Sequence, residues 1–114
     1  MTSQIRCADI VRLRRYDAVC VAARQGAPVL CFFVPDTETT RHRADVSLSM
    51  CESAEAGLPP DRRVRCVGRA HGGGGQVVGR MPAPAMQRIH GMLAQEMARQ
   101  AGEQEHDRGR PARR

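Results

Sequence analysis

Ala18-Val19-Cys20-Val21-Ala22-Ala23 and Val29-Leu30-Cys31-Phe32-Phe33-Val34 are two apolar runs on either side of Gln25-Gly26-Ala27-Pro28. The intervening residues predict a turn, because glycine tolerates a positive φ and proline fixes its own φ. Runs this short, with several β-branched residues, are typical of buried strands rather than helices. The two runs therefore predict an antiparallel hairpin at the centre of the fold.

Weaker strand patterns surround this hairpin. A first strand is expected over residues 5–13, and short strands over residues 64–67 and 77–78. Residues 43–50 alternate strictly, with Ala44, Val46, Leu48 and Met50 on one side, which predicts a half-buried strand. Residues 51–61 are interpreted as a loop. The four glycines at 72–75 are interpreted as a flexible hairpin loop, since they lack the context of a phosphate-binding motif.

One helix is expected at the C-terminal end. Proline at positions 82 and 84 marks its start, and an apolar stripe at helical spacing follows, made of Met86, Ile89, Leu93 and Met97. We expect the helix to end at Gly102, which leaves residues 1–101 as one domain and residues 102–114 as a disordered, arginine-rich tail. Strands followed by one helix predict a mainly β fold, a small barrel or strongly bent sheet of the SH3-like kind.

The net charge and the spacing of the cysteines restrict the classes of function that this chain can have. The formal net charge is +6, which favours a polyanionic partner such as nucleic acid or an acidic protein, although a solvated basic surface is the alternative. The five cysteines include no C-x-x-C pair, which argues against zinc and against a secreted disulfide framework. The N-terminal residues lack the apolar run of a signal peptide, and no stretch reaches membrane-spanning length, so we expect a cytoplasmic protein without membrane contact.

Several short motifs follow one another along the chain. They are Ala8-Asp9-Ile10-Val11, Arg14-Arg15 before an apolar strand, Val34-Pro35-Asp36-Thr37, Gly57-Leu58-Pro59, Val64-Arg65-Cys66, and Val78-Gly79-Arg80-Met81 followed by the apolar stripe. In this order they resemble the MazF/PemK toxin family, whose barrel is of the MazF/PemK/CcdB kind. The resemblance spans about residues 7–97, and its strongest part is the approach to the C-terminal helix.

The resemblance implies a homodimeric endoribonuclease that cleaves single-stranded mRNA without metal or other cofactor and is inhibited by a cognate antitoxin protein. Arg15, or its neighbour Arg14, takes the place of the arginine that stabilises the charged phosphate of the transition state. Thr37 takes the place of the family's hydroxyl residue, and Arg65 matches an arginine used in one branch. The predicted catalytic residues are thus Arg15, Thr37 and Arg65. The predicted RNA contacts are Arg14, Arg41, His42 and Arg43.

Departures from the family pattern support a second hypothesis. Val67 stands where that branch has an aspartate, and the loop between the first two strands is short. His42 and His71 are of the right type to transfer protons instead, although the favoured interpretation of each is an ordinary loop histidine. The alternative to an enzyme is therefore an inactive barrel of this kind that binds protein or nucleic acid.

Overall fold

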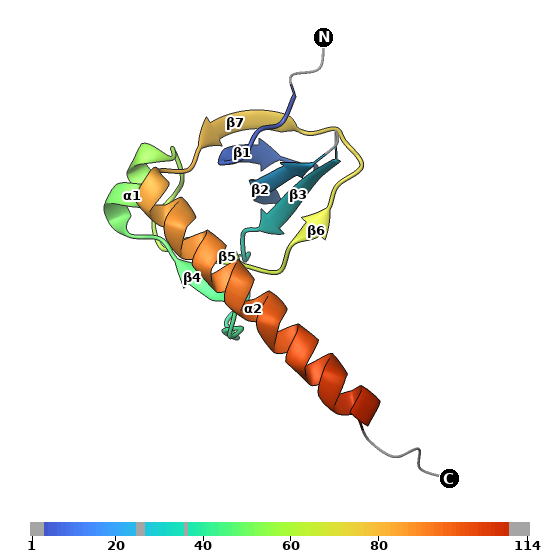
Figure 1. Ribbon diagram of the computed structural model, residues 1–114. Helices are drawn as coiled ribbons and strands as arrows, with labels where there is room; N and C mark the ends of the chain where they lie inside the picture. Colours follow the sequence, from blue (N-terminus) through green and yellow to red (C-terminus); the bar gives the residue numbers. More distant parts are fainter. Residues whose placement is uncertain (1–3, 25–26, 36, 110–114) are drawn as a thin grey trace.

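The main structural feature is a five-stranded antiparallel sheet, seen in a computed structural model that describes residues 4–24, 27–35 and 37–109 (Figure 1). Its strand order is β6-β3-β2-β1-β7. The strands are β1 (Asp9–Arg12), β2 (Asp17–Arg24), β3 (Ala27–Phe32), β6 (Arg69–Ala70) and β7 (Gln76–Arg80). The predicted mainly β fold with a C-terminal helix is confirmed.

The predicted central hairpin is formed by β2 and β3, which pair antiparallel with Val19 opposite Cys31 and Cys20 opposite Leu30. Residues 25 and 26 of the predicted turn lie outside the described residues. The prediction that the turn includes Ala27 and Pro28 is wrong, because both belong to β3 and pair with Arg24 and Ala23 of β2. Side chains alternate between two cores: Val19 and Cys31 belong to one cluster, and Cys20 and Leu30 to another. Because both faces of the hairpin are buried, its sequence is continuously apolar instead of alternating.

The five-stranded sheet is bent but does not close into a barrel. Register shifts occur between Ile10 and Val11 of β1 and between Cys20 and Ala22 of β2, and such irregularities bend a strand and increase its twist. The two edge strands are not paired with each other. β6 has only two residues, which is too short to form a ladder that would close the sheet.

A separate two-stranded sheet, β4 (Asp45–Ser47) with β5 (Arg63–Arg65), packs beside the first. A bridge between Phe33 and Val64 joins the two sheets. β4 is much shorter than the strand predicted over residues 43–50. Ala44, Val46 and Leu48 are buried as predicted, but the prediction for Met50 is wrong, because its side chain is 78% exposed.

The loop predicted over residues 51–61 is also partly wrong, because helix α1 covers Met50–Glu55. Ser49 caps this helix: its hydroxyl accepts from the Glu52 N–H, and the Glu52 carboxylate accepts from the Ser49 N–H. This reciprocal pair satisfies two backbone donors that helix formation leaves unpaired. The spacing Ser49-x-x-Glu52 is the sequence signal that would have predicted the helix.

Glu52 makes the stability of the fold depend on pH. Arg88 donates to its carboxylate at 2.6 and 2.7 Å, and this contact, with the Ser49 N–H, lowers the pKa of Glu52 to about 2 from an ordinary 4.5. The unfolded chain then binds the proton at higher pH than the folded chain does. The stabilisation is therefore complete above about pH 5 and is lost as the pH falls toward about 2.

We expect Glu52→Gln to lower the free energy of unfolding by about 2 kcal/mol near neutral pH, since the half-exposed Arg88 weakens the pair. The difference from wild type should shrink in acid. Urea unfolding of both proteins at about pH 7 and about pH 3 checks this. Glu55→Gln, on the exposed side of the same helix, is the control; an equal effect there would contradict the assignment.

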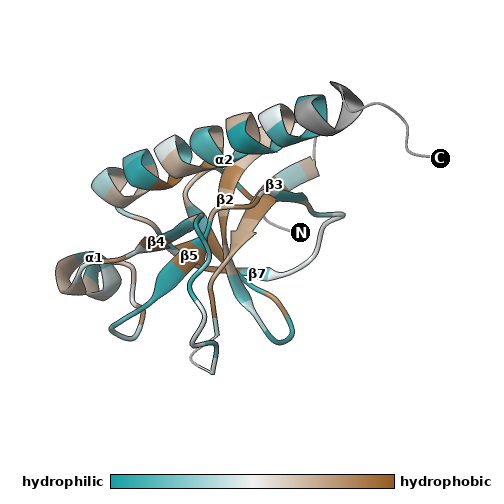
Figure 2. Ribbon diagram, turned by 90° about the horizontal axis from the view of Figure 1, so that it is seen from below, coloured by the Kyte–Doolittle hydropathy of each residue, from teal (hydrophilic) through white to brown (hydrophobic). Residues whose placement is uncertain are grey.

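Helix α2 (Ala83–Gly109) lies across β2 and β4 and extends beyond the sheets (Figures 1 and 2). Met86 and Ile89 are buried and Leu93 is partly buried, as predicted, but Met97 is 63% exposed. Neither helix in the described part of the chain is long and apolar enough to cross a membrane.

The helix end predicted at Gly102 is wrong, because α2 continues to Gly109. A glycine inside a helix costs only about 1 kcal/mol, and an ionic contact across the fold holds this region. Arg43 donates to Glu96 at 2.8 and 3.1 Å and to Glu103 at 2.7 Å. Residues 110–114 of the predicted tail lie outside the described residues.

The last glycine of the 72–75 stretch has a packing role that the prediction of a flexible loop did not include. Gly75 has a φ of +95°, and a Cβ there would lie 2.7 Å from side-chain atoms of Val11 and Leu13. We expect Gly75→Ala to lower the free energy of unfolding by about 2–3 kcal/mol, through backbone strain and overpacking. Thermal and urea unfolding would measure it. At Gly72 a Cβ meets no atom within 4 Å, so an equal loss in Gly72→Ala would refute this explanation.

Candidate functional site

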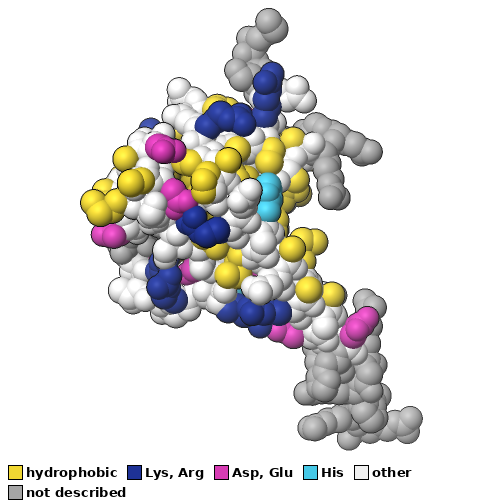
Figure 3. Space-filling view, turned by 60° about the vertical axis from the view of Figure 1, so that its left-hand side comes forward, with side chains coloured by type: hydrophobic (Ala, Val, Ile, Leu, Met, Phe, Trp, Pro, Cys, Tyr) yellow, Lys and Arg dark blue, Asp and Glu magenta, His cyan; other side chains and the backbone are white. Residues whose placement is uncertain are grey.

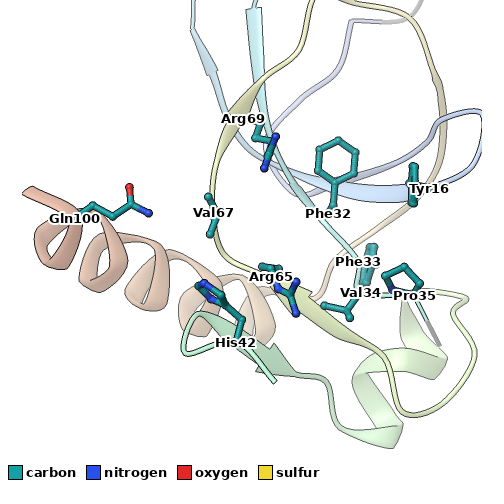
Figure 4. A pocket seen from close by; sticks show the side chains of 10 residues that line it. All are labelled: Tyr16, Phe32, Phe33, Val34, Pro35, His42, Arg65, Val67, Arg69 and Gln100. Atoms are coloured by element: carbon teal, nitrogen blue, oxygen red, sulfur yellow. The ribbon is translucent and has the colours of Figure 1, made fainter. Parts of the chain in front are cut away.

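Two adjoining hollows form a groove at the ends of β2, β3 and β5. The larger has a volume of about 730 Å³ (Figure 4) and the smaller about 190 Å³. They share Tyr16, Phe33, Val34 and Pro35. The larger extends toward α2, where Gln100 lines it. We call the two hollows together the groove.

All three aromatic side chains of the chain line the larger hollow. The sequence contains one tyrosine, two phenylalanines and no tryptophan, and Tyr16, Phe32 and Phe33 are all lining residues. Neighbouring residues of an extended chain point to opposite sides, which explains the different surroundings of the two phenylalanines. Phe33 is buried in the larger core cluster, whereas Phe32 is partly buried beside the other. The groove thus has an aromatic wall built from the last residue of β3, Phe32, and from Tyr16 and Phe33, which directly adjoin β2 and β3.

The charged lining of the groove is predominantly positive. It contains Arg15, Arg62, Arg65 and Arg69 against one carboxylate, Asp17. Asp17 is paired with Arg12 at 3.2 Å. The side chains of Arg15 and Arg69 make no hydrogen bond or ion pair with other described residues. Figure 3 shows one face of the molecule, on which arginine, acidic and hydrophobic side chains are interspersed.

Arg65 is held in place by Asp45, which faces it across the β4–β5 pair. The Arg65 guanidinium donates to the two carboxylate oxygens at 2.9 and 3.2 Å, and Arg63 donates to Asp45 Oδ2 at 2.6 Å. The Asp45 side chain is fully buried. Burial raises the pKa of Asp45, but hydrogen bonds from Arg65 and from the His42 N–H outweigh it and lower the pKa below its usual value. Asp45 therefore stays ionised and orients Arg65.

Arg63 extends this network to the segment before β4. Its guanidinium donates to the carbonyl oxygens of Glu38 at 2.6 Å and Thr40 at 3.3 Å. The network therefore fastens residues that follow Thr37. The alternation over residues 43–50 puts Asp45 on the polar side of a predicted strand. It indicates no partner for Asp45, because a strand pattern does not report which other strand lies beside it.

His42 is the lining histidine, and its hydrogen bonding limits its chemistry. The backbone N–H of Ala44 donates to Nδ1 at 3.0 Å, so the neutral ring carries its proton on Nε2. In this arrangement His42 can donate from Nε2 to an anionic oxygen but has no free ring lone pair to accept a proton. His71 lies in the loop after β6, 3.1 Å from the Gly74 carbonyl oxygen, and does not line the groove.

The structure brings three of the predicted site residues to the groove: Arg15, His42 and Arg65. Thr37 is exposed in the turn after Pro35 and is not a lining residue. Arg14 is likewise exposed, in the four-residue connection between β1 and β2.

The remaining predicted RNA contacts, Arg41 and Arg43, are engaged elsewhere. Arg41 donates to the Ser47 hydroxyl at 2.7 Å, and Arg43 binds Glu96 and Glu103 on α2. Neither arginine lines the groove. Conversely, the sequence analysis missed Tyr16 and Arg69. Tyr16 directly follows Arg15, which is a signal, but Arg69 lies on a two-residue strand that no pattern indicates.

The buried cysteines are not suited to act as nucleophiles. Cys31 and Cys66 are fully buried, and burial raises the pKa of each thiol to about 12. Both are therefore protonated at neutral pH, whereas the thiolate is the reactive form. Within residues 4–24, 27–35 and 37–109, no group of three or more His, Cys, Asp or Glu side chains could hold a metal ion.

Comparison of the chain with protein-family models and with curated proteins finds no match.

Proposed function

We propose that this chain is a MazF/PemK-like endoribonuclease that binds single-stranded RNA in the groove and cleaves it without a metal ion. The observation that carries the proposal is the position of Arg15 and Arg65. These residues are far apart in the sequence, yet they line adjoining hollows that open onto the same aromatic and aliphatic wall. Positive charge beside exposed aromatic surface is the combination that binds single strands.

The cleavage chemistry assigns roles to Arg15, Arg65 and His42, which line the groove, and to Asp45 and Thr37, which do not. When the ribose 2′-oxygen attacks the neighbouring phosphorus, negative charge builds on the phosphate oxygens before the bond to the 5′-oxygen breaks. Arg15 and Arg65 stabilise that charge through paired N–H donors. Asp45 fixes the orientation of Arg65 beforehand. The proton of the 2′-hydroxyl passes to solvent water, and the leaving 5′-oxygen takes a proton from water while the His42 Nε2–H donates a hydrogen bond to it. The Thr37 hydroxyl donates to a phosphate oxygen when the RNA is bound.

The proposal includes the partners and the finer fold that the family resemblance implies. The bent sheet with its C-terminal helix is of the SH3-like MazF/PemK/CcdB kind. The chain acts in the cytoplasm as a homodimer, which buries apolar surface that the small core leaves exposed. A cognate antitoxin inhibits it by laying an acidic segment across the positive groove, where it competes with RNA.

The test is cleavage of a long single-stranded RNA in the presence of EDTA. Discrete cuts with 5′-hydroxyl ends are the expected result. A matched oligonucleotide with a single 2′-deoxyribose at the mapped cut site should resist cleavage, because the attacking oxygen is missing. Intact RNA from folded protein would contradict the enzyme proposal, and so would cleavage of the deoxy-substituted control.

The second candidate is a module of the same fold that binds RNA or protein without cleaving it. Its support is that the lining carboxylate and histidine are both engaged. Asp17 is paired with Arg12, and the Ala44 N–H occupies His42 Nδ1. Neither group is free to deprotonate a 2′-hydroxyl in this arrangement. RNA binding by a protein that leaves the RNA intact would favour this candidate.

A further inference from the structure

Tyr16 has the position of a stacking platform. It is 51% exposed, and it belongs to both hollows of the groove. Its backbone is fixed by a hydrogen bond from the Leu13 N–H to the Tyr16 carbonyl oxygen at 2.8 Å. Its ring packs edge to face on Phe32, with centroids 6.2 Å apart and an interplanar angle of 88°. Phe32 therefore supports the ring, and Tyr16 remains half exposed to a ligand.

The surrounding charges indicate what kind of ligand fits. Arg15 lines the smaller hollow and Arg69 the larger, so a ligand that occupies both hollows meets an arginine without a described partner in each. A nucleic acid single strand carries a phosphate at every nucleotide and an unpaired base between phosphates. Base–aromatic stacking contributes about 1–3 kcal/mol per base. A duplex offers no free base face for stacking, because its bases are already stacked on one another.

We propose that the Tyr16 ring stacks on one unpaired base of the RNA, while Arg15 and Arg69 bind phosphates in the two hollows. This inference rests on the proposed function, in that RNA is the ligand. It adds a binding residue that the motifs did not identify. It also explains why this aromatic residue is exposed when the core has so few aromatic side chains.

A direct test uses a short 2′-O-methyl RNA, which binds but cannot be cleaved. Fluorescence anisotropy would compare wild type with Tyr16→Leu, Tyr16→Phe and the control Met50→Ala, which removes an exposed apolar side chain on α1. Tyr16→Leu is expected to weaken binding about tenfold, and Tyr16→Phe and Met50→Ala less than about twofold. An abasic strand of the same length should bind wild type and Tyr16→Leu equally weakly.

Tyr16 also provides a readout that needs no substitution. The chain contains one tyrosine and no tryptophan, so intrinsic fluorescence reports on Tyr16 alone. Base-bearing RNA should quench it, and abasic RNA should not. Equal binding of the two strands, unchanged affinity of Tyr16→Leu, or quenching by an acidic peptide but not by RNA would each overturn the inference.

Cleavage measured on the same proteins separates this inference from the proposed function. RNA that is cut with no effect of Tyr16→Leu on binding overturns only the stacking platform. RNA that stacks on Tyr16 but stays intact supports the platform and overturns only the ribonuclease. Arg69→Ala adds an independent check: it should reduce the slope of log affinity against log salt by about 0.7, because one phosphate contact is lost.

Discussion

Replacing Asp45 by asparagine is expected to lower the free energy of unfolding by about 3 kcal/mol. The substitution leaves Arg63 and Arg65 without their shared carboxylate, inside a site where the Asp45 side chain is fully buried. This loss lies at the lower end of the range for removing one partner of a buried ion pair. The reason is that the side chains of Arg63 and Arg65 are still 15% and 33% exposed and keep some hydration.

Urea unfolding measures this change, and Asp17→Asn is the matched control. Asp17 pairs with Arg12, whose side chain is 60% exposed, so its loss should cost less than about 1 kcal/mol. If Asp45→Asn cost no more than the control, the network could not be what fastens Arg65 and the residues before β4.

Replacing Arg15 by alanine is expected to reduce the rate of RNA cleavage by about 100-fold or more at saturating RNA, since a group that stabilises transition-state charge typically contributes that much. The fold should be unaffected, because the Arg15 side chain is exposed and bonded to no other described residue. Arg15→Lys should recover only part of the activity, because an ammonium group cannot make the planar paired contacts of a guanidinium.

Arg6→Ala controls for the loss of one positive charge. Arg6 is exposed ahead of β1 and lines neither hollow, so its removal should change the rate less than about threefold. Single-turnover rates in EDTA, with thermal unfolding as the check on folding, provide the comparison. Equal losses in Arg6→Ala and Arg15→Ala would mean that overall charge, and not a positioned arginine, governs the reaction.

Local patterns predicted the strands and the helix wherever the spacing of apolar residues along the chain decides which side chains are buried. The apolar run at residues 18–23 lies within β2, and the run at residues 29–34 continues two residues beyond the end of β3. These runs mark the strands because a strand that is buried on both faces has to be apolar throughout. The helix start predicted at Pro82 and Pro84 agrees with the observed start at Ala83, because proline is favoured in the first turn of a helix. The errors arose where contacts between residues far apart in the sequence decide which secondary structure forms. α1 depends on a cap and on Arg88, and the far end of α2 depends on Arg43.

The candidate site divides in the same way. The sequence motifs identified Arg15, His42 and Arg65, which line the groove, but also Arg41 and Arg43, which bind other side chains. Whether an arginine faces a groove or an acidic partner depends on which strand or helix lies beside it. That partner is set by tertiary packing, and neither residue type nor spacing reports it.

By itself the sequence determined the secondary-structure class, the central hairpin and the positive charge, because local propensity and apolar periodicity act over a few neighbouring residues. Only the tertiary structure decided that the sheet stays open, that Asp45 is buried between two arginines, and that all three aromatic residues meet in one groove. These features join residues tens of positions apart, and their energies depend on distances that exist only once the strands have paired.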